Sequence, residues 1–245
     1  MTDCIFQKNV LSKKECDIVI DFFNKRTEFH NPGEAGGSRN EKSKKSVDIN
    51  MVFSPTKEDE LKYSIDGDIR KVNDILKKGI IDALHDYKKK YFFIDYECLN
   101  PWILNEYYNI QRYLPNEGYF SLHCENAGKM HSPSELVDCK RMLVWMLYLN
   151  DVTDGGYTEF PHQDKKFQPI CGDMILWPAF WTHPHKGVTS KTQTKYIATG
   201  WFSFNTEISF FSSADGQPTR CFNKPINEPD PVGKKFLPKR WWKIR

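Results

Sequence analysis

The second half of the sequence is a series of short apolar segments separated by turn residues. RMLVWMLYLN (141–150) is apolar throughout, as expected of a strand buried on both faces of a sheet. YYNIQRYL (107–114) alternates between apolar and polar residues, and NEG (116–118) is a turn. Further strands are expected over VDINMVF (47–53), YFSLHCE (119–125), QPICGDMILWP (168–178), FWTHPHKGV (180–188) and TKYIATGWFSF (194–204). DVTDGGYTEF (151–160) is expected to be a Gly-Gly turn that leads into a strand. So many short strands at close spacing predict a β-sandwich or a double-sheet barrel.

The first hundred residues have the period of amphipathic helices instead. Ser12 and Glu15 form a capping-box pattern, and the apolar residues that follow predict a helix over about 13–26. A second, longer helix is expected from about Ile69 and ends in the lysines 88–90. Between them, residues 31–46 are polar, glycine-rich and basic, which is typical of a long loop. This loop is a candidate lid, with a plain insertion as the alternative.

Together these patterns predict a mainly β fold with flanking N-terminal helices. Residues 1–205 are expected to form one domain, with helical support over about 1–100 and a β core over about 105–204. Residues 206–245 are expected to be a C-terminal extension that is basic and aromatic at its end. Contact with single-stranded nucleic acid is one interpretation of that end. We favour the other, in which its tryptophans pack on the domain and its lysines stay in water.

The composition argues against several classes of protein. The seven cysteines are odd in number and contain no CxxC pair, which disfavours a disulfide framework and a zinc knuckle. Reduced thiols and a cytoplasmic location are therefore expected. The first residues lack the apolar core of a signal peptide, and no apolar run approaches the ~20 residues that cross a membrane, so no membrane partner is expected. The net charge of +3 is too small to indicate nucleic-acid binding by itself.

Two pairs of residues, each separated by one position, suggest a metal site. His123 and Glu125 would project from the same face of a strand, and so would His183 and His185. Two histidines and one carboxylate form the facial triad of non-haem Fe(II) oxygenases, which leaves coordination positions open. The HxE pair alone is a weak signal, because an ordinary exposed His–Glu pair occurs in many chains.

Lys195 strengthens this pattern. It follows His185 by ten residues, in a segment whose neighbours Tyr196 and Ile197 are expected to be buried. A buried ammonium is unfavourable unless it pairs with an anion, so Lys195 is a candidate to bind a ligand carboxylate. A solvated lysine on a strand is the alternative interpretation.

A resemblance to a known family is carried by the order of four segments. These are YNIQRYLPNEGYFSLHCEN, RMLVWMLYLNDVTDGGYTEFP, PICGDMILWPAFWTHPHKG and TKYIATGWF. They resemble the catalytic domain of the 2-oxoglutarate and Fe(II)-dependent dioxygenases, in the prolyl 4-hydroxylase-like branch. The resemblance covers about residues 105–204, and YLNDVTDGGYTEFP is its most specific stretch. It implies a double-stranded β-helix of the jelly-roll, cupin-like kind.

The resemblance also implies the metal ligands. His123, Glu125 and His185 would bind iron. His185 is preferred to His183, because the HKG sequence and the spacing to Lys195 match the family. His183 would then be a nearby pocket or core residue, and the reverse assignment is the alternative.

Further roles follow from the same resemblance. Lys195 and Tyr113 would bind the distal carboxylate of 2-oxoglutarate, and Thr158 in GGYTEFP would lie near the same site. Arg141 is similar to a recurring arginine of the family, although a surface charge at a strand end explains it equally well. Glu125 departs from the HxD of most of the family, and the extra methylene puts metal affinity and full activity in doubt.

The implied activity is hydroxylation of a C–H bond, with conversion of 2-oxoglutarate and O2 to succinate and CO2 and with ascorbate as reductant. The substrate would be a protein, a peptide or a small molecule, and peptidyl proline is frequent in the family. A catalytically weak or inactive oxygenase-fold metal-binding protein is one alternative. A cupin-like zinc or manganese hydrolase or isomerase is another, and it would not need Lys195 or Tyr113.

Overall fold

A seven-stranded antiparallel sheet is the largest element of the fold. The computed structural model describes residues 3–35, 38–53, 67–96, 99, 101–126 and 139–205. Within these residues the strand order of the sheet is β1-β10-β7-β12-β5-β4-β2. Its strands are β1 (Phe6–Asn9), β2 (Asn31–Pro32), β4 (Val47–Val52), β5 (Trp102–Tyr113), β7 (Arg141–Tyr148), β10 (Asp173–Pro178) and β12 (Lys195–Phe204).

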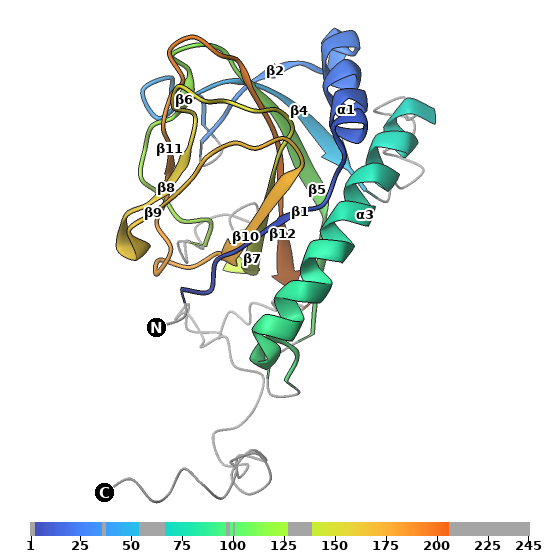
Figure 1. The fold of residues 1–245 in the computed structure, drawn as a ribbon, viewed down its shortest axis with the longest axis vertical. Helices are drawn as coiled ribbons and strands as arrows, with labels where there is room; N and C mark the ends of the chain where they lie inside the picture. Colours follow the sequence, from blue (N-terminus) through green and yellow to red (C-terminus); the bar gives the residue numbers. More distant parts are fainter. Residues whose placement is uncertain are drawn as a thin grey trace, which may run out of the picture.

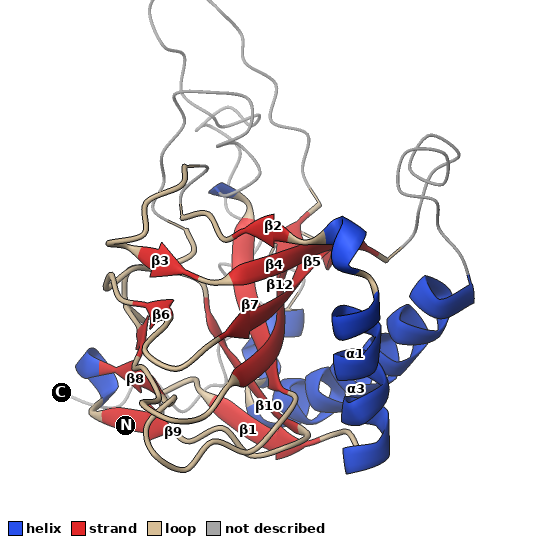
Figure 2. Ribbon diagram, turned by 90° about the horizontal axis from the view of Figure 1, so that it is seen from above, coloured by secondary structure: helices blue, strands red, loops and turns tan. Residues whose placement is uncertain are grey.

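The two α-helices cover one face of this sheet, as Figures 1 and 2 show. The helical segments are α1 (Lys13–Lys25), α3 (Gly67–Lys90) and the short 3-10 helices η1 (Thr27–Phe29), η2 (Phe92–Asp95) and η3 (Pro161–Gln163). The predicted capping box is present at the start of α1, where the Ser12 backbone N–H donates to the Glu15 carboxylate at 2.9 Å. Leu76 and Ile80 of α3 are completely buried, so its apolar stripe packs into the core as the period predicted. No helix in the described part of the chain is both long enough and apolar enough to cross a membrane.

Shorter strands lie beyond the opposite face of the large sheet (Figure 2). A three-stranded sheet has the order β11-β8-β9, and β3 pairs with β6. Their bounds are β3 (Lys44–Lys45), β6 (Gly118–Tyr119), β8 (Thr158–Phe160), β9 (Lys165–Phe167) and β11 (Lys186–Gly187). Two layers of antiparallel strands with helices packed outside agree with the predicted mainly β, jelly-roll architecture.

The central strand β7 is buried on both faces, as its sequence predicted. Leu143 and Trp145 belong to the apolar core shared with the helices. Val144 and Tyr148 belong to a second core, which lies between the two layers of strands. The large sheet therefore has one face that anchors helices and another that faces the interior between the layers, where the site described below is built.

Several predicted elements differ from the structure. Of residues 119–125 only Tyr119 is in a strand, and of 180–188 only 186–187 are. Pro184 interrupts the second of these segments, because proline has no N–H to donate to a neighbouring strand. Directly after the first segment, the side-chain amide of Asn126 donates to two backbone carbonyls at 2.8 Å. Strand β1 was not predicted, because its four residues FQKN have no clear apolar period; it pairs with the edge of β10.

The polar segment 31–46 is not a continuous loop. It contains β2 and β3, and the backbone carbonyl of Ser43 accepts from the Phe120 N–H at 2.8 Å. This segment is thus hydrogen-bonded to the chain just before His123, and its function as a lid stays a prediction. The C-terminal extension 206–245, with the basic and aromatic end considered for nucleic-acid contact, lies outside the described residues.

Candidate metal centre and cosubstrate pocket

Three predicted ligands converge at one point in the structure. The Nε2 atom of His123 lies 3.3 Å from Oε1 of Glu125, and Nε2 of His185 lies 3.4 Å from the same oxygen. The candidate ligand atoms of the three residues all lie within 4.8 Å of one another. Three ligands that each bind one ion at roughly 2.1 Å, on one octahedral face, are about 3 Å apart. The arrangement therefore fits a divalent metal with a facial triad.

The backbone fixes the two histidines relative to each other. The His123 N–H donates to the His185 carbonyl at 3.0 Å, and the His185 N–H donates to the His123 carbonyl at 2.8 Å. This isolated antiparallel bridge lies outside the regular strands, yet it sets the two side chains side by side. The two segments that were wrongly predicted as long strands thus still pair at the position that matters for the site.

Second hydrogen bonds select the ring nitrogens that face the centre. Nδ1 of His123 lies 2.9 Å from the Ser121 carbonyl, and Nδ1 of His185 lies 3.1 Å from the His183 carbonyl. A carbonyl only accepts, so each Nδ1 carries the proton and each Nε2 presents its lone pair to the metal position.

His183 has a different environment. Its Nε2 lies 2.7 Å from the Asp3 carbonyl, and its Nδ1 lies 2.9 Å from the Thr182 hydroxyl. Both ring nitrogens are thus occupied by protein partners. The geometry favours His185 as the distal ligand and makes His183 a buried structural residue that ties the N-terminal segment to the site.

The protonation states suit metal binding. Burial alone would raise the pKa of Glu125, but interactions with the neighbouring His123 and His185 hold that pKa well below its usual range. Burial, together with the charge of His123, lowers the pKa of His185. An ionised Glu125 beside a neutral His185 is what a divalent ion requires of these two ligands.

The second oxygen of Glu125 is held by two other side chains. The Trp201 indole N–H donates to Oε2 at 2.9 Å, and an Nη1 of Arg141 lies 3.5 Å from the same oxygen. The Arg141 guanidinium lies 3.7 Å from the centre of the Trp201 ring. Arg141 is therefore part of the site environment, and the alternative of a strand-end surface charge is not supported. These contacts fix the longer glutamate in one position, with Oε1 toward the histidines.

We expect Glu125→Asp to weaken metal binding, although aspartate is usual in the resembling family. The shorter side chain cannot both reach Trp201 and place an oxygen beside the histidines. Loss of such outer contacts typically lowers metal affinity about 10–100-fold. Titration of the metal-free protein with Mn(II), followed by electron paramagnetic resonance, measures the change. Trp201→Phe, which removes the indole N–H donor but keeps an aromatic ring, should give a smaller loss. A Glu125→Asp protein that binds as tightly as the parent would contradict this account.

Lys195 is the first residue of β12 and pairs with Tyr113 of β5 in the sheet. Its ammonium donates to the Gly156 carbonyl at 3.0 Å and lies 4.9 Å from the centre of the Tyr113 ring. Among the residues that the structure describes, no carboxylate forms an ion pair with it. Burial lowers the pKa of Lys195 to about 8. A buried cation with spare donors is suited to an anionic ligand.

The other two predicted pocket residues are buried near Lys195 or the metal centre. The Tyr113 hydroxyl donates to Oε1 of Gln111 at 2.6 Å. The Thr158 hydroxyl oxygen lies 2.8 Å from the Tyr148 hydroxyl, and Thr158 pairs with Gly187, two residues after His185. Tyr113 and Thr158 are thus brought to the interior side of the large sheet, and their binding of a ligand stays a prediction.

Two residues of the site were not predicted from the sequence. Trp201 holds Glu125, and the ring of Tyr119 stacks on His123 with centroids 3.7 Å apart. A signal for Trp201 existed, since alternate residues of a strand share a face and Lys195 is six positions before it. The same alternation would place Tyr119 on the face of His123 in the predicted strand 119–125, although that strand ends at Tyr119 in the structure.

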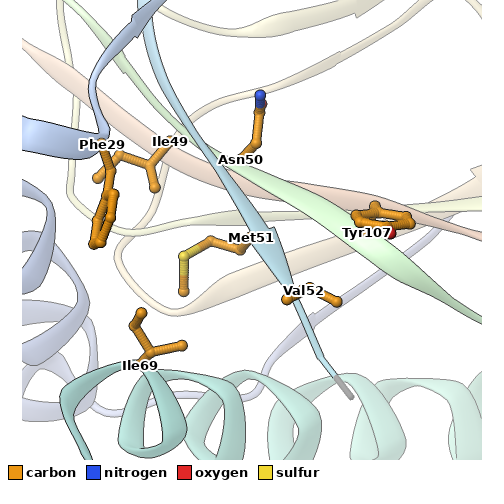
Figure 3. Close-up of a pocket in the computed structure, with 7 residues that line it drawn as sticks. All are labelled: Phe29, Ile49, Asn50, Met51, Val52, Ile69 and Tyr107. Carbon is orange, nitrogen blue, oxygen red and sulfur yellow. The ribbon is translucent and has the colours of Figure 1, made fainter. Parts of the chain in front are cut away.

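A separate hollow lies away from the metal centre, on β4 beside the start of α3 (Figure 3). The figure shows side chains of Met51 and Ile69 directed toward one another across it. Its lining is largely apolar and is made by Phe29, Ile49, Asn50, Met51, Val52, Ile69 and Tyr107. It contains neither the triad nor Lys195, so we do not assign the chemistry to it.

Comparison with known proteins adds a sequence family. Residues 108–203 match the sequence model of the 2OG-Fe(II) oxygenase superfamily. A protein of Acanthamoeba polyphaga mimivirus, whose provisional name is prolyl 4-hydroxylase, is 32% identical over 103 residues. That match covers 38% of this chain and 43% of the mimivirus protein, less than half of its length.

Solved structures share the fold. One is the 2OG complex of the viral collagen prolyl hydroxylase of Paramecium Bursaria Chlorella virus-1, which is 19% identical in sequence and superimposes with a TM-score of 0.55. The match covers 82% of this chain and 96% of the viral chain. A Trichoplax adhaerens prolyl hydroxylase, in complex with a hypoxia inducible factor oxygen degradation domain peptide fragment, is 15% identical with a TM-score of 0.60 and covers 83% and 84%. These likenesses confirm the predicted double-stranded β-helix with flanking helices.

Proposed function

We propose, on the premise that residues 108–203 place this chain in the 2OG-Fe(II) oxygenase superfamily, a specific activity for it. The chain is an Fe(II)- and 2-oxoglutarate-dependent oxygenase that hydroxylates a C–H bond. The observation that carries the proposal is the convergence of His123, Glu125 and His185 with Nε2–Oε1 distances of 3.3 and 3.4 Å. The buried Lys195 is the second support, because a metal hydrolase built on the same triad has no use for it.

The metal ion and cosubstrate supply the oxidising chemistry, in which O2 and 2-oxoglutarate become succinate and CO2 while one oxygen atom enters the substrate C–H bond. His123, Glu125 and His185 would hold the ion, and three protein ligands would leave coordination positions for the cosubstrate and O2. Ascorbate is proposed as the reductant that restores oxidised iron.

Lys195 and Tyr113 are proposed to hold the distal carboxylate of 2-oxoglutarate, with Thr158 beside them. An ammonium buried in a low-dielectric pocket attracts a carboxylate far more strongly than it would in water. Binding would also require the Tyr113 hydroxyl to turn from Gln111 toward the ligand. The buried wall formed by these residues would exclude water from the cosubstrate.

We propose a peptide substrate, with peptidyl proline as the first to be tried. The Trichoplax structure contains a peptide, which supports this class by fold likeness alone. Two aromatic rings also border the metal position, since Tyr119 stacks on His123 and Trp201 bonds to Glu125. Flat aromatic rings beside two of the metal ligands suit a small apolar ring such as that of proline. A cytoplasmic location is proposed as well, and the free thiols of Cys4, Cys16, Cys124 and Cys171 support it.

An anaerobic titration tests the proposed function. Adding Fe(II) and then 2-oxoglutarate should produce a visible charge-transfer band, and admitting air should release succinate in proportion to 2-oxoglutarate consumed. His123→Ala should lose both signals, because one ligand of the triad is gone. Metal binding without any effect of 2-oxoglutarate would overturn the proposal and favour a cupin-like zinc or manganese enzyme. A band without succinate release, with every peptide tried, would favour an inactive metal-binding protein.

A further inference from the structure

A buried ion pair lies beside the proposed cosubstrate pocket. The Lys44 ammonium lies 2.6 Å from Oδ2 of Asp48, and their side chains are only 4% and 7% exposed. Lys44 is in β3, where it pairs with Tyr119 of β6, and its ammonium lies 5.8 Å from the centre of the Tyr119 ring. That ring in turn stacks on His123. The pair is therefore near the metal centre, and the function proposed above does not use it.

Asp48 is linked to Tyr113 by hydrogen bonds. The Gln111 side-chain amide lies 3.4 Å from Oδ2 of Asp48, and its Oε1 accepts from the Tyr113 hydroxyl at 2.6 Å. The sheet register places Asp48 directly opposite Gln111, and Tyr113 directly opposite Lys195. Because residues 111 and 113 share a face of β5, Asp48 lies on the same interior wall as Lys195.

The negative charge of Asp48 acts at Tyr113. Burial is the main cause that raises the pKa of the Tyr113 hydroxyl, and the charge of Asp48 is the next. A ligand carboxylate bound by Lys195 and Tyr113 would feel the same charge as repulsion, with little water to screen it. A buried aspartate is thus unfavourable for a dianion unless another charge balances it.

We propose that Lys44 is a positioning residue for the cosubstrate, in that it neutralises Asp48 and so keeps the distal end of the pocket able to accept a second carboxylate. This inference rests on the proposed binding of 2-oxoglutarate. It assigns Lys44 a role through charge, at a distance, and leaves direct contact with the ligand to Lys195 and Tyr113. It also gives residues 31–46 a function in the pocket, since Lys44 is supplied by that segment.

The test compares two ligands that differ only at the distal end. 2-Oxoglutarate and 2-oxobutyrate offer the metal the same 2-oxo acid group, but the second has no distal carboxylate. Calorimetric binding to the Mn(II)-loaded protein is expected to show that Lys44→Met weakens 2-oxoglutarate about tenfold or more, a change of ~1.4 kcal/mol. Binding of 2-oxobutyrate should change less than about twofold, because it carries no charge near Asp48.

Second variants keep the test decisive if Lys44→Met folds poorly. Lys44→Met with Asp48→Asn removes both charges and should restore 2-oxoglutarate affinity to within about threefold of the parent. Asp48→Asn alone should strengthen 2-oxoglutarate binding, since only the repulsive charge is lost. Lys8→Met is the matched control: it breaks ion pairs with Asp82 and Asp86 of α3, on the helix side of the sheet, and should alter neither affinity.

Two results would overturn the inference. Equal weakening of both ligands by Lys44→Met would show a general disturbance of the site, and unchanged 2-oxoglutarate binding in that variant and in Asp48→Asn would show no charge effect. Failure of the proposed function looks different, because the unaltered protein would then bind neither 2-oxo acid in a metal-dependent way.

Discussion

His185→Ala is expected to abolish tight metal binding, whereas His183→Ala leaves it nearly unchanged. The two histidines are two positions apart and both are buried, so the comparison is well matched. Of these two histidines, only His185 directs a ring nitrogen to Glu125, at 3.4 Å. Both ring nitrogens of His183 are hydrogen-bonded to other protein groups. Loss of a direct ligand should lower Mn(II) affinity by more than the roughly 10–100-fold typical of an outer contact.

The control for this pair is thermal unfolding of the metal-free proteins. His183→Ala removes the bond to the Asp3 carbonyl and should lower stability by about 1 kcal/mol, with metal affinity retained. The opposite pattern, with metal binding lost in His183→Ala and kept in His185→Ala, would exchange the two assignments.

Lys195→Met is expected to raise the dissociation constant of 2-oxoglutarate by roughly 30-fold to several thousand-fold, since truncating one partner of a buried charge pair costs about 2–5 kcal/mol. Binding of 2-oxobutyrate should be nearly unaffected. Lys195→Arg should not rescue the loss, because the larger planar guanidinium does not fit a closed position shaped for an ammonium. Metal affinity, measured in the same variants, should stay within about threefold of the parent, since Lys195 is not a ligand.

The pH dependence of the same constant follows from the pKa of Lys195, lowered by burial to about 8. Below that pH the group is an ammonium and 2-oxoglutarate affinity should be constant. Above it the free protein loses the proton, so affinity for 2-oxoglutarate should fall by about tenfold per pH unit.

The same group affects the stability of the ligand-free fold. In the unfolded chain Lys195 keeps its proton to about pH 10.4, so the free energy of unfolding should increase as the pH rises from about 8 to about 10.4. A flat profile in the unaltered protein, or a sloping one in Lys195→Met, would contradict the assignment.

The sequence predicted those parts of the protein that depend on local periodicity. The capping box at Ser12, the stripe of α3 and the doubly buried β7 appear as expected. Spacing together with the resemblance selected His123, Glu125 and His185, and the structure brings these three together. These features were predictable because each is encoded within a short segment of the sequence.

Contacts between distant segments were not predictable in this way. Asp48 and Gln111 are 63 positions apart, and only the pairing of β4 with β5 makes them neighbours. Lys44 sits in a basic, polar stretch whose composition is typical of a solvated loop, and its burial follows from a two-residue strand too short to have a period. The fixing of Glu125 by Trp201 and Arg141 likewise depends on three segments meeting, which no single stretch encodes.

The reciprocal backbone bridge between His123 and His185 bears on the order of assembly of the centre. Both imidazoles are oriented by main-chain hydrogen bonds and by their own Nδ1 contacts before any ion arrives. Most of the conformational entropy of gathering the ligands is therefore lost during folding, and little remains to be lost on metal uptake. The apoprotein should accordingly keep its native shape after chelation, and the ion should be exchangeable without refolding.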